Sequence, residues 1–278
     1  MLMRFAAVKL LFALCLAAIL VWTSAARAQV KSVSLPLNAR QLTGMRVENS
    51  DGQKVGSIRN LVLDLKSGEL KYVVVGSGGF LGVRATLKVV PSQAMSAATA
   101  KRQTVAVHAT ATQWAQAPAF KWSSLASLEE PNRAREISRY FERSPANASV
   151  SKTNLLSTTG GESGTNAPEL ELKFASSLIG MRVVNQNQEK IGEVLDLLVN
   201  FGKPRPALAI ISSGRLFHEG RQYAVPLSAL ALSETDHKLT LKANAATLQQ
   251  APPFSQQAWD ARGKSGSNRI YQYSMPED

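Results

Sequence analysis

Two stretches of the chain are nearly the same: LTGMRVENSDGQKVGSI at residues 42–58 and LIGMRVVNQNQEKIGEV at residues 178–194. Eight of the 17 positions are identical and in the same order, although the two stretches lie in different halves of the chain. Chance rarely produces such a match in an ordinary globular chain, so the stretches indicate an internal duplication. The repeated unit therefore decides how the fold is divided.

The similarity continues well beyond the opening stretch. Three further pairs of segments correspond in the same order: YVVV and LAII at 72–75 and 208–211, Val-Pro at 90–91 and 225–226, and Ala-Pro-x-Phe at 117–120 and 251–254. The spacing between the copies changes slightly from pair to pair, and it does so between apolar runs, where loops tolerate insertions. A unit of about 105 residues is a normal domain size, so the sequence predicts two tandem domains, at 35–143 and 169–278.

Residues 144–168, SPANASVSKTNLLSTTGGESGTNAP, separate the two copies. This composition buries too little apolar area to offset the entropy of ordering, so a flexible linker is predicted. A flexible chain of this length spans about 27 Å on average. We therefore expect each domain to close its own apolar interior and the linker to leave their mutual orientation free.

The N-terminus has the order of a secretory signal peptide. Arg4 and Lys9 precede an apolar run at 10–22, and Ala26-Arg27-Ala28 is an A-x-A cleavage site. The run is shorter than the roughly 20 residues that a membrane-spanning helix needs, although an uncleaved anchor is the alternative. The sequence thus predicts a signal peptide at 1–28, with export to the periplasm after cleavage near Ala28.

Basic residues outnumber acidic ones, 32 to 20. The excess is concentrated in the first copy: residues 29–120 hold 11 basic and 4 acidic residues, against 12 and 11 in residues 169–278. We expect the first domain to favour an anionic partner, such as an acidic protein, a cell-wall polymer or acidic lipid headgroups. Nucleic acid is not expected, because an exported protein rarely meets it. A basic surface that only maintains solubility is the alternative.

Within one unit the pattern is mostly that of β-strands. Short runs rich in Val, Ile and Leu alternate with turn residues, which is typical of a small barrel or sandwich. In the first copy the predicted strands are 45–48, 55–65, 70–75, 86–90 and 104–107, and short helices are predicted near 110–116 and 127–143. Leu128, Ile137 and Phe141 are expected to form the apolar stripe of the second helical segment. Gly44, Gly56 and their equivalents are expected where a strand enters a turn or bends.

These residues resemble the PRC-barrel domain, which the photosynthetic reaction centre H subunit and the ribosome maturation factor RimM share. The similarity lies in Gly-Met-Arg-Val, Lys-Val-Gly, Tyr-Val-Val-Val and Val-Pro in the first copy, and it covers most of each unit. The resemblance implies two compact, mostly antiparallel six-stranded β-barrels in tandem, each with a short C-terminal helical segment. It also implies a domain used for binding and assembly rather than for turnover.

Seven basic residues of the first copy are the candidates for a face that binds an anionic partner. Such a face requires that several of them gather on one side of the barrel. They are Arg46, Lys54, Arg59, Lys66, Lys71, Arg84 and Lys88.

Two residues of the second copy are candidates because of their place in the repeat. Arg182 repeats Arg46, and a guanidinium on a strand can bind a carboxylate or phosphate through two hydrogen bonds, or simply lie along an exposed face. Asp196 stands where the first copy has Asn60. Its carboxylate could pair with a base or metal in this copy alone, or accept hydrogen bonds from backbone groups.

No catalytic residue, cofactor site or metal site is predicted. His108, His218 and His237 lack the spacing of metal ligands, and no Ser lies in a G-x-S-x-G turn. The GSGG run at 76–79 lacks the Lys-Ser/Thr pair and the helix start of a phosphate-binding loop. Trp114, Trp122 and Trp259 are expected to pack the segments after the strands onto the barrels.

The sequence therefore predicts an exported, non-enzymatic protein of the cell envelope that binds, scaffolds or assembles other components. Its partner is an unknown protein or an anionic envelope component, and its oligomeric state stays open. One alternative is a binder of membrane surfaces or anionic polymers that acts peripherally through the basic first domain. The other alternative is an enzyme with an unrecognised site. Two linked modules would raise avidity if both engaged one partner.

Overall fold

The computed structural model describes residues 37–78, 85–97, 104–143, 170–202, 206–213, 221–242 and 254–255. The described residues all belong to one compact unit. The signal peptide predicted at 1–28 and the linker predicted at 144–168 lie outside the described residues, as do Arg84, His218 and Trp259. Among the described residues, no helix combines the length and the apolar character needed to cross a membrane.

The first copy forms a curved sheet, here called the first barrel. Its strand order is β6-β7-β2-β3-β4-β5-β8. Neighbouring strands are antiparallel except β2 and β7, which run parallel. The strands are β2 (Arg46–Glu48), β3 (Lys54–Asp64), β4 (Leu70–Ser77), β5 (Thr86–Pro91), β6 (Met95–Ala97), β7 (Thr104–Val107) and β8 (Ala119–Phe120), and the 3-10 turn η1 (Ser92–Ala94) links β5 to β6.

The second copy repeats this arrangement as the second barrel. Its strand order is β13-β12-β11-β10-β15-β14, and β10 and β15 are the parallel pair. The strands are β10 (Arg182–Val184), β11 (Lys190–Val199), β12 (Leu208–Ser213), β13 (Gln222–Pro226), β14 (Leu230–Ser233) and β15 (Lys238–Leu241), with the 3-10 turn η6 (Leu227–Ala229) between β13 and β14. Two mostly antiparallel β-barrels in tandem are thereby confirmed.

The five strands predicted in the first copy are present, with ends that differ by at most two residues. The C-terminal part of β3, at 60–64, and the centre of β4 are buried on both faces, as the Val-rich sequence of 72–75 suggests. The sequence did not predict β6 and β8, because strands of two or three residues carry no measurable alternation.

Two helices follow β7, one on each side of the short strand β8, where the sequence predicts helical segments. They are α3 (Ala111–Gln116) and α4 (Pro131–Glu142), with short 3-10 turns η2 (Trp122–Ser124) and η3 (Ala126–Leu128) between them. The Thr110 hydroxyl caps α3 by accepting from Gln113 N, and Pro131 starts α4 at a position that needs no amide donor. Ile137 and Phe141 of α4 are buried together with Leu128, so the predicted apolar stripe is confirmed. The corresponding segment of the second copy lies outside the described residues.

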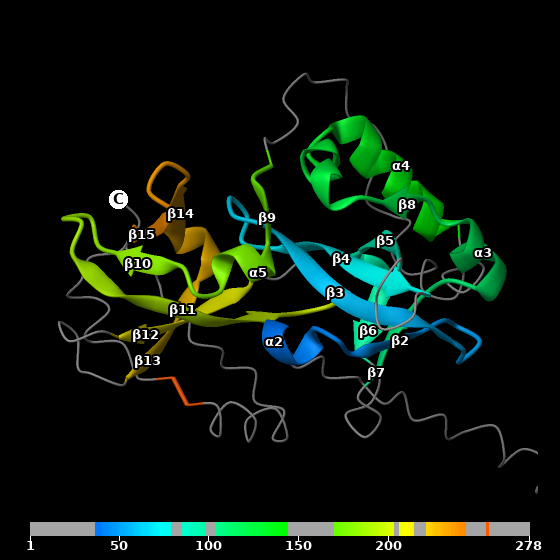
Figure 1. The fold of residues 1–278 in the computed structure, drawn as a ribbon, viewed down its shortest axis with the longest axis horizontal. Coiled ribbons are helices and arrows are strands. Elements are labelled where there is room, and N and C mark those ends of the chain that lie inside the picture. The colour runs from blue at the N-terminus through cyan, green and yellow to red at the C-terminus, as the bar shows by residue number, and fades with distance from the viewer. Residues whose placement is uncertain are drawn as a thin grey trace, which may run out of the picture. The chain divides into compact units, whose positions relative to one another are not determined.

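Each barrel receives a strand from the other copy. Strand β9 (Leu172–Phe174) precedes the second barrel in sequence but pairs with β3 of the first, and β1 (Leu37–Asn38) precedes the first barrel but pairs with β11 of the second. Asn38 faces Leu198 and Phe174 faces Val62, and each residue of one pair is the repeat equivalent of a residue in the other. Figure 1 shows β9 beside β3, and the short helix that follows β1 beside β11. We call this arrangement the exchange.

A one-turn helix extends each exchanged strand. Helix α2 (Ala39–Leu42) packs against β11, and α5 (Ala175–Leu178) packs against β3. Leu42 and Leu178, the first residues of the two repeated stretches, are both fully buried. Burying one leucine side chain contributes about 1.5–3 kcal/mol, so these two residues anchor the exchanged segments.

The glycine that follows each anchor turns the chain back toward its own barrel. Gly44 and Gly180 have φ of 86° and 91°, a region that residues with a Cβ rarely adopt. Gly44 N donates to Ile58 O, and Gly180 N donates to Val194 O, in the strands of their own copies. The phrase Leu-x-Gly-Met-Arg-Val therefore encodes an anchor on the other barrel, a turn and a first strand.

A second glycine in each repeat lets two strands approach closely. A Cβ on Gly56 would lie 2.3 Å from Gly76 O, and a Cβ on Gly192 would lie 1.7 Å from Ser212 O. Both glycines precede a bulge, between Ile58 and Asn60 in the first copy and at the equivalent place in the second. The predicted role of these glycines at strand bends is therefore confirmed.

One continuous apolar core runs through both copies. It includes Val47 and Val105 of the first barrel and Val183 and Leu239 of the second, all fully buried. The expectation that each copy closes its own interior is therefore wrong, as is the expectation of a free mutual orientation. The physical reason is the exchange, because each barrel completes its wall with residues of the other copy.

Candidate interaction surface

Lys88 is a structural residue rather than part of a basic face. Its side chain is buried, with 6% exposed, although it was a predicted contact for an anionic partner. Its Nζ donates to Trp114 O at 2.5 Å, Ala117 O at 2.9 Å and Ala115 O at 3.1 Å, and lies 5.5 Å from the centre of the Trp114 ring. These carbonyls lie at and just beyond the C-terminal end of α3, where helix carbonyls carry partial negative charge, and Trp114 O also accepts from Ala117 N. The prediction for Lys88 is wrong, since its ammonium already caps α3.

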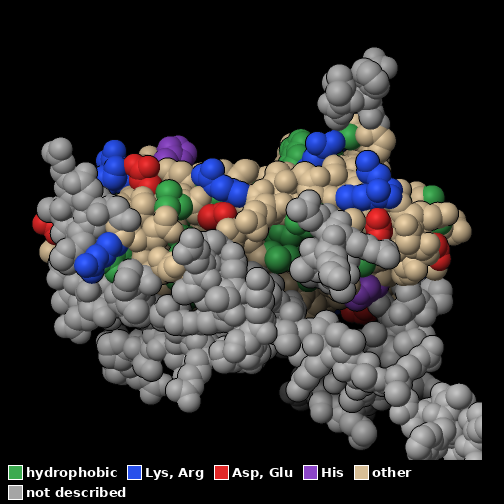
Figure 2. All heavy atoms as spheres, turned by 90° about the horizontal axis from the view of Figure 1, so that it is seen from below, with side chains coloured by type: hydrophobic (Ala, Val, Ile, Leu, Met, Phe, Trp, Pro, Cys, Tyr) green, Lys and Arg blue, Asp and Glu red, His purple; other side chains and the backbone are tan. Residues whose placement is uncertain are grey.

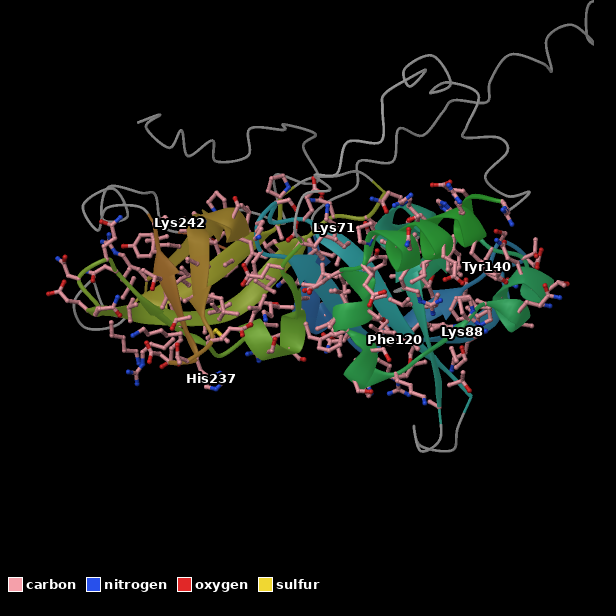
Figure 3. The ribbon with its side chains drawn as sticks, turned by 90° about the horizontal axis from the view of Figure 1, so that it is seen from above. Lys71, Lys88, Phe120, Tyr140, His237 and Lys242 are labelled. Atoms are coloured by element: carbon pink, nitrogen blue, oxygen red, sulfur yellow. The ribbon has the colours of Figure 1, made fainter. Side chains whose placement is uncertain are left out.

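Burial lowers the pKa of Lys88 below its ordinary value. The equivalent residue of the second copy is Tyr223, which is fully buried and whose hydroxyl has no hydrogen-bond partner within the described part of the chain. In Figure 3, Lys88 of β5 lies near Phe120 of the paired strand β8. Lys71 lies farther from both residues in this view. The two barrels thus differ at this position, with a hydrogen-bonded ammonium in the first and a buried phenol in the second.

Acidic neighbours accompany three of the predicted basic residues. Arg46 Nε lies 3.2 Å from Glu48 Oε1, and Lys54 faces the same Glu48 across the β2–β3 pair. Lys71 Nζ lies 2.7 Å from Glu69 Oε2. These pairs reduce the positive potential that the three side chains would otherwise present.

The remaining described candidates are Arg59 and Lys66, both exposed. Arg59 is the bulged residue of β3, and its side chain lies so close to Gly76 that a Cβ there would be 2.7 Å from Arg59 Nε. Lys66 lies in the β3–β4 turn, where its backbone N donates to Asp64. On the face drawn in Figure 2, basic and acidic side chains are scattered, with no single continuous basic patch among the described residues.

Arg182 repeats the setting of Arg46 on the surface of the second barrel. It is exposed on β10 and faces Glu193 across the β10–β11 pair. A hydrogen bond and the positive charge of Lys190 lower the pKa of Glu193, and Arg182 adds to this effect. The structure therefore places Arg182 in a small network of surface charges.

Asp196 belongs to the junction between the two copies. Its Oδ1 accepts from Leu197 N at 2.8 Å and from Arg40 N at 3.2 Å, and the Arg40 side chain donates through Nε to Leu195 O at 2.8 Å. Of the roles considered from sequence, the acceptance of backbone hydrogen bonds is the one observed. What the sequence did not indicate is that one donor belongs to the other copy.

Asn60 makes the matching junction in the first barrel. Its Oδ1 accepts from Leu61 N at 2.9 Å and from Ser176 N at 3.3 Å, and its Nδ2 donates to Ser176 Oγ at 2.7 Å. Asn60 and Asp196 thus have the same role: the side-chain oxygen of each accepts a hydrogen bond from a backbone N of the other copy. The acceptor is an amide in the first barrel and a carboxylate in the second.

The turns after β3 and β11 also reach the other copy. Ala207 N donates to Gly68 O at 2.7 Å, and Gly202 N donates to Ser92 O at 3.1 Å. Asp64 accepts from Glu171 N at 3.0 Å as well as from residues of its own turn. Hydrogen bonds therefore reinforce the exchange along its whole length.

An arginine ridge on α4 is a basic surface that the sequence analysis missed. Arg135 and Arg139 of α4 and Arg143, the residue that caps its C-terminal end, are exposed and lie four residues apart, so they follow one face of the helix. Glu136 is paired with Arg133 at 2.8 Å, which leaves Glu142 as the other acid of the exposed face. The four-residue spacing in RAREISRYFER could have revealed this ridge, had the candidates been extended beyond the barrel.

Trp122 is the large apolar side chain most open to solvent among the described residues, with 46% exposed. Its ring meets Phe120 edge-on at 6.4 Å and Phe174 of the exchanged strand at 5.2 Å. The packing expected of Trp114 is confirmed by its burial, whereas Trp122 covers the exchanged strand only in part.

Among the described residues, no group of three or more His, Cys, Asp or Glu side chains could hold a metal ion. His108 Nε2 lies 3.1 Å from Ser96 Oγ, and burial lowers the pKa of this histidine. His237 occupies a turn with φ of 47°.

A comparison with models of known protein families also divides the chain into two copies of one domain. The model of the PRC-barrel domain matches residues 37–113 and 171–248. Each match begins at or next to the exchanged strand; the first ends within α3, before β8, and the second ends beyond β15. A search of curated proteins finds no match for the chain. Because the two matches cover more than half of the chain, this protein belongs to the PRC-barrel family and carries two copies of its domain.

Proposed function

We propose that this chain is a non-enzymatic binding or assembly protein that is exported and works in the cell envelope. Its two PRC-barrel domains support a binding or assembly role. The observation that carries the proposal is the exchange, because two barrels with one core present their surfaces in a fixed relation. A partner that touches both barrels then binds without the entropic cost of ordering two loose modules.

The proposal of export rests on the sequence of residues 1–28, with its basic start, its apolar run and Ala26-Arg27-Ala28. Intact mass of the protein purified from its own cell envelope tests this part. The expected mass is that of a chain beginning at Gln29. A full-length mass would contradict cleavage, and recovery only from the cytoplasm would contradict export.

In-cell photo-crosslinking tests the binding role. A photo-reactive residue replaces exposed Arg139 on α4 or exposed Arg182 on β10, and buried Val105 serves as the control position. A binding protein is expected to give discrete adducts from an exposed position, with the same attached component in repeated experiments. Adducts from all three positions alike, or none from either exposed position, would contradict the proposal.

A second candidate function is binding to an anionic surface or polymer through the first domain. The arginine ridge of α4 favours it, with three exposed guanidinium groups on one helix face. The site therefore differs from the barrel residues predicted from sequence, of which Lys88 is buried and Arg46 and Lys71 are paired with acids.

Sedimentation with vesicles tests this second candidate. Binding to vesicles with anionic headgroups is expected at low salt, with release at high salt because exposed charges are screened. The triple change of Arg135, Arg139 and Arg143 to Gln should weaken binding at least tenfold, whereas Lys54→Gln with Arg59→Gln should change it less than threefold. Equal binding to neutral vesicles, or equal loss in both variants, would contradict the ridge as the site.

A further inference from the structure

The exchange joins two halves of one chain through contacts that do not depend on which chain supplies them. The first barrel takes β9 and α5, and the second barrel takes β1 and α2. The contacts that define the exchange are made by residues 37–64 and 172–199, on either side of the connection at 144–168. Two chains could therefore form the same two junctions with each other.

We propose that a second copy of this chain is a partner of the protein, in an exchanged dimer. In this dimer the first barrel of each chain receives β9 and α5 of the other chain, and the second barrel receives β1 and α2. All contacts across the junctions are those of the single chain, including the two hydrogen bonds between Asn60 and Ser176. The inference is independent of the proposed binding role.

The balance between the two forms depends on the linker. Since the junctions are the same, the forms differ mainly in the entropy of connecting the halves. With the linker predicted from the sequence, the effective concentration is on the order of 1 mM, so we expect the closed single chain to dominate at micromolar concentration. The fraction of protein in the dimer is expected to rise as the protein concentration approaches that value, for example on a crowded surface.

The structure also sets a minimum length for the linker in the closed single chain. Leu172 N donates to Glu129 Oε1 at 2.9 Å, so the exchanged strand begins beside the N-terminal end of α4. The linker leaves from Arg143, at the C-terminal end of that helix of 12 residues. The closed chain must therefore bridge a span of roughly 18 Å, the length of α4. Without residues 144–169, the three peptide units from Arg143 to Leu172 reach about 11 Å at most. That deletion should prevent closure within one chain.

A cysteine pair placed across the junction distinguishes the two forms. Asn60→Cys and Ser176→Cys, in a chain with Cys15→Ser, put two thiols on residues whose side chains are now hydrogen-bonded to each other. Oxidation gives an intrachain disulfide in the closed chain and an interchain disulfide in the exchanged dimer. Ser96→Cys with Ala106→Cys, neighbours across β6 and β7 of one barrel, is the control pair that stays intrachain in both forms.

The chain with its full linker is refolded at micromolar and at millimolar concentration, oxidised and analysed without reducing agent. We expect only intrachain links at low concentration and at least one fifth of the protein as interchain dimer at high concentration, with the control pair intrachain throughout. The chain lacking residues 144–169 should be dimeric by mass even when dilute. Intrachain links alone at every concentration in the full-linker chain would overturn the proposal, whatever the shortened chain does. Equal interchain linking of the control pair would overturn it too.

Discussion

Asn60 and Ser176 belong to different copies of the repeat and are joined by two hydrogen bonds, from Asn60 Nδ2 to Ser176 Oγ and from Ser176 N to Asn60 Oδ1. The same two positions in the other half are Asp196 and Arg40, which are also bonded to each other. The duplication is therefore visible in the junctions between the barrels as well as in the barrels themselves.

The Asn60–Ser176 pair should couple the stabilities of the two halves. Asn60→Ala and Ser176→Ala are each expected to lower the free energy of unfolding by about 1–2 kcal/mol, because each leaves a partly buried polar group without its partner. In the double variant the losses should fall short of their sum by about 0.5 kcal/mol or more, since the residues are in contact. Chemical denaturation of the four proteins measures this coupling.

Ser177→Ala is the control for this cycle. Ser177 is exposed and its hydroxyl donates to Phe174 O within the same segment. When Ser177→Ala is combined with Asn60→Ala, the departure from the sum of the two single losses is expected to stay under about 0.5 kcal/mol. Strict additivity of the Asn60 and Ser176 changes would show that the junction does not couple the halves.

The two halves should not fold as independent monomers. Cutting the chain in the linker removes β9 from β3 and β1 from β11, and exposes Leu63 and Val199, which are now at most 1% exposed. The whole chain is expected to unfold in one cooperative transition by circular dichroism and fluorescence alike. Fragments 34–143 and 170–278 should regain this transition only when mixed. A sigmoidal transition of either fragment as a monomer, with an m-value suited to its size, would contradict the single core.

Asp64 should make stability depend on acid pH. Burial raises its pKa, but hydrogen bonds from Ser67, Glu171 and Lys66 outweigh this effect and hold the pKa below its ordinary value of 3.8. A carboxyl whose pKa is lower in the folded state stabilises the fold above about pH 4, and this contribution is lost as pH falls through the folded pKa.

The variant Asp64→Asn lacks that contribution. It is expected to be about 1–2 kcal/mol less stable than the parent chain at pH 7, because an amide accepts these bonds less strongly. The difference should shrink as pH falls below 3.8, the ordinary pKa of Asp. Urea denaturation between pH 7 and pH 3 measures both curves. Glu136→Gln, on the exposed face of α4, should shift stability by under about 1 kcal/mol. A constant difference across this range would contradict the role of the Asp64 charge.

Lys88 should hold α3 against the first barrel. Lys88→Met keeps an unbranched side chain but removes the ammonium that donates to three carbonyls of the 114–117 turn. A loss of about 1–3 kcal/mol is expected, together with faster hydrogen exchange of the α3 amides. Lys121→Met, an exposed lysine in the same region, is the matched control and should leave both quantities nearly unchanged. Unaltered exchange in α3 of the Lys88 variant would show that the cap is dispensable.

Local chemistry made most of the fold predictable. The strands from Lys54 to Asp64 and from Leu70 to Ser77 combine apolar runs with turns that contain Gly52 and Gly68, and both glycines have positive φ. Helix α4 begins at Pro131 and follows a helical spacing of buried residues. Such signals lie within a few residues of each other, so one sequence suffices to detect them.

Lys88 shows where local reasoning fails. A lysine within a strand is expected to face water, because an unpaired buried ammonium is costly. Its burial depends on carbonyls of residues 114, 115 and 117, which reach it only after the chain has turned back along β5 through β8. The arginine ridge of α4, in contrast, could have been predicted from local sequence, because the four-residue spacing of its arginines is visible there.

The sequence by itself determined that there are two copies, where their strands and turns lie, and that each opens with a buried leucine and a glycine. Only the tertiary structure decided which barrel each opening segment completes. Because β3 and β11 are repeats of one strand, they offer nearly the same edge, and segments as short as Leu37–Asn38 carry too little pattern to specify a partner. That choice depends on contacts between residues far apart in the sequence, which form only when both copies pack around a single core.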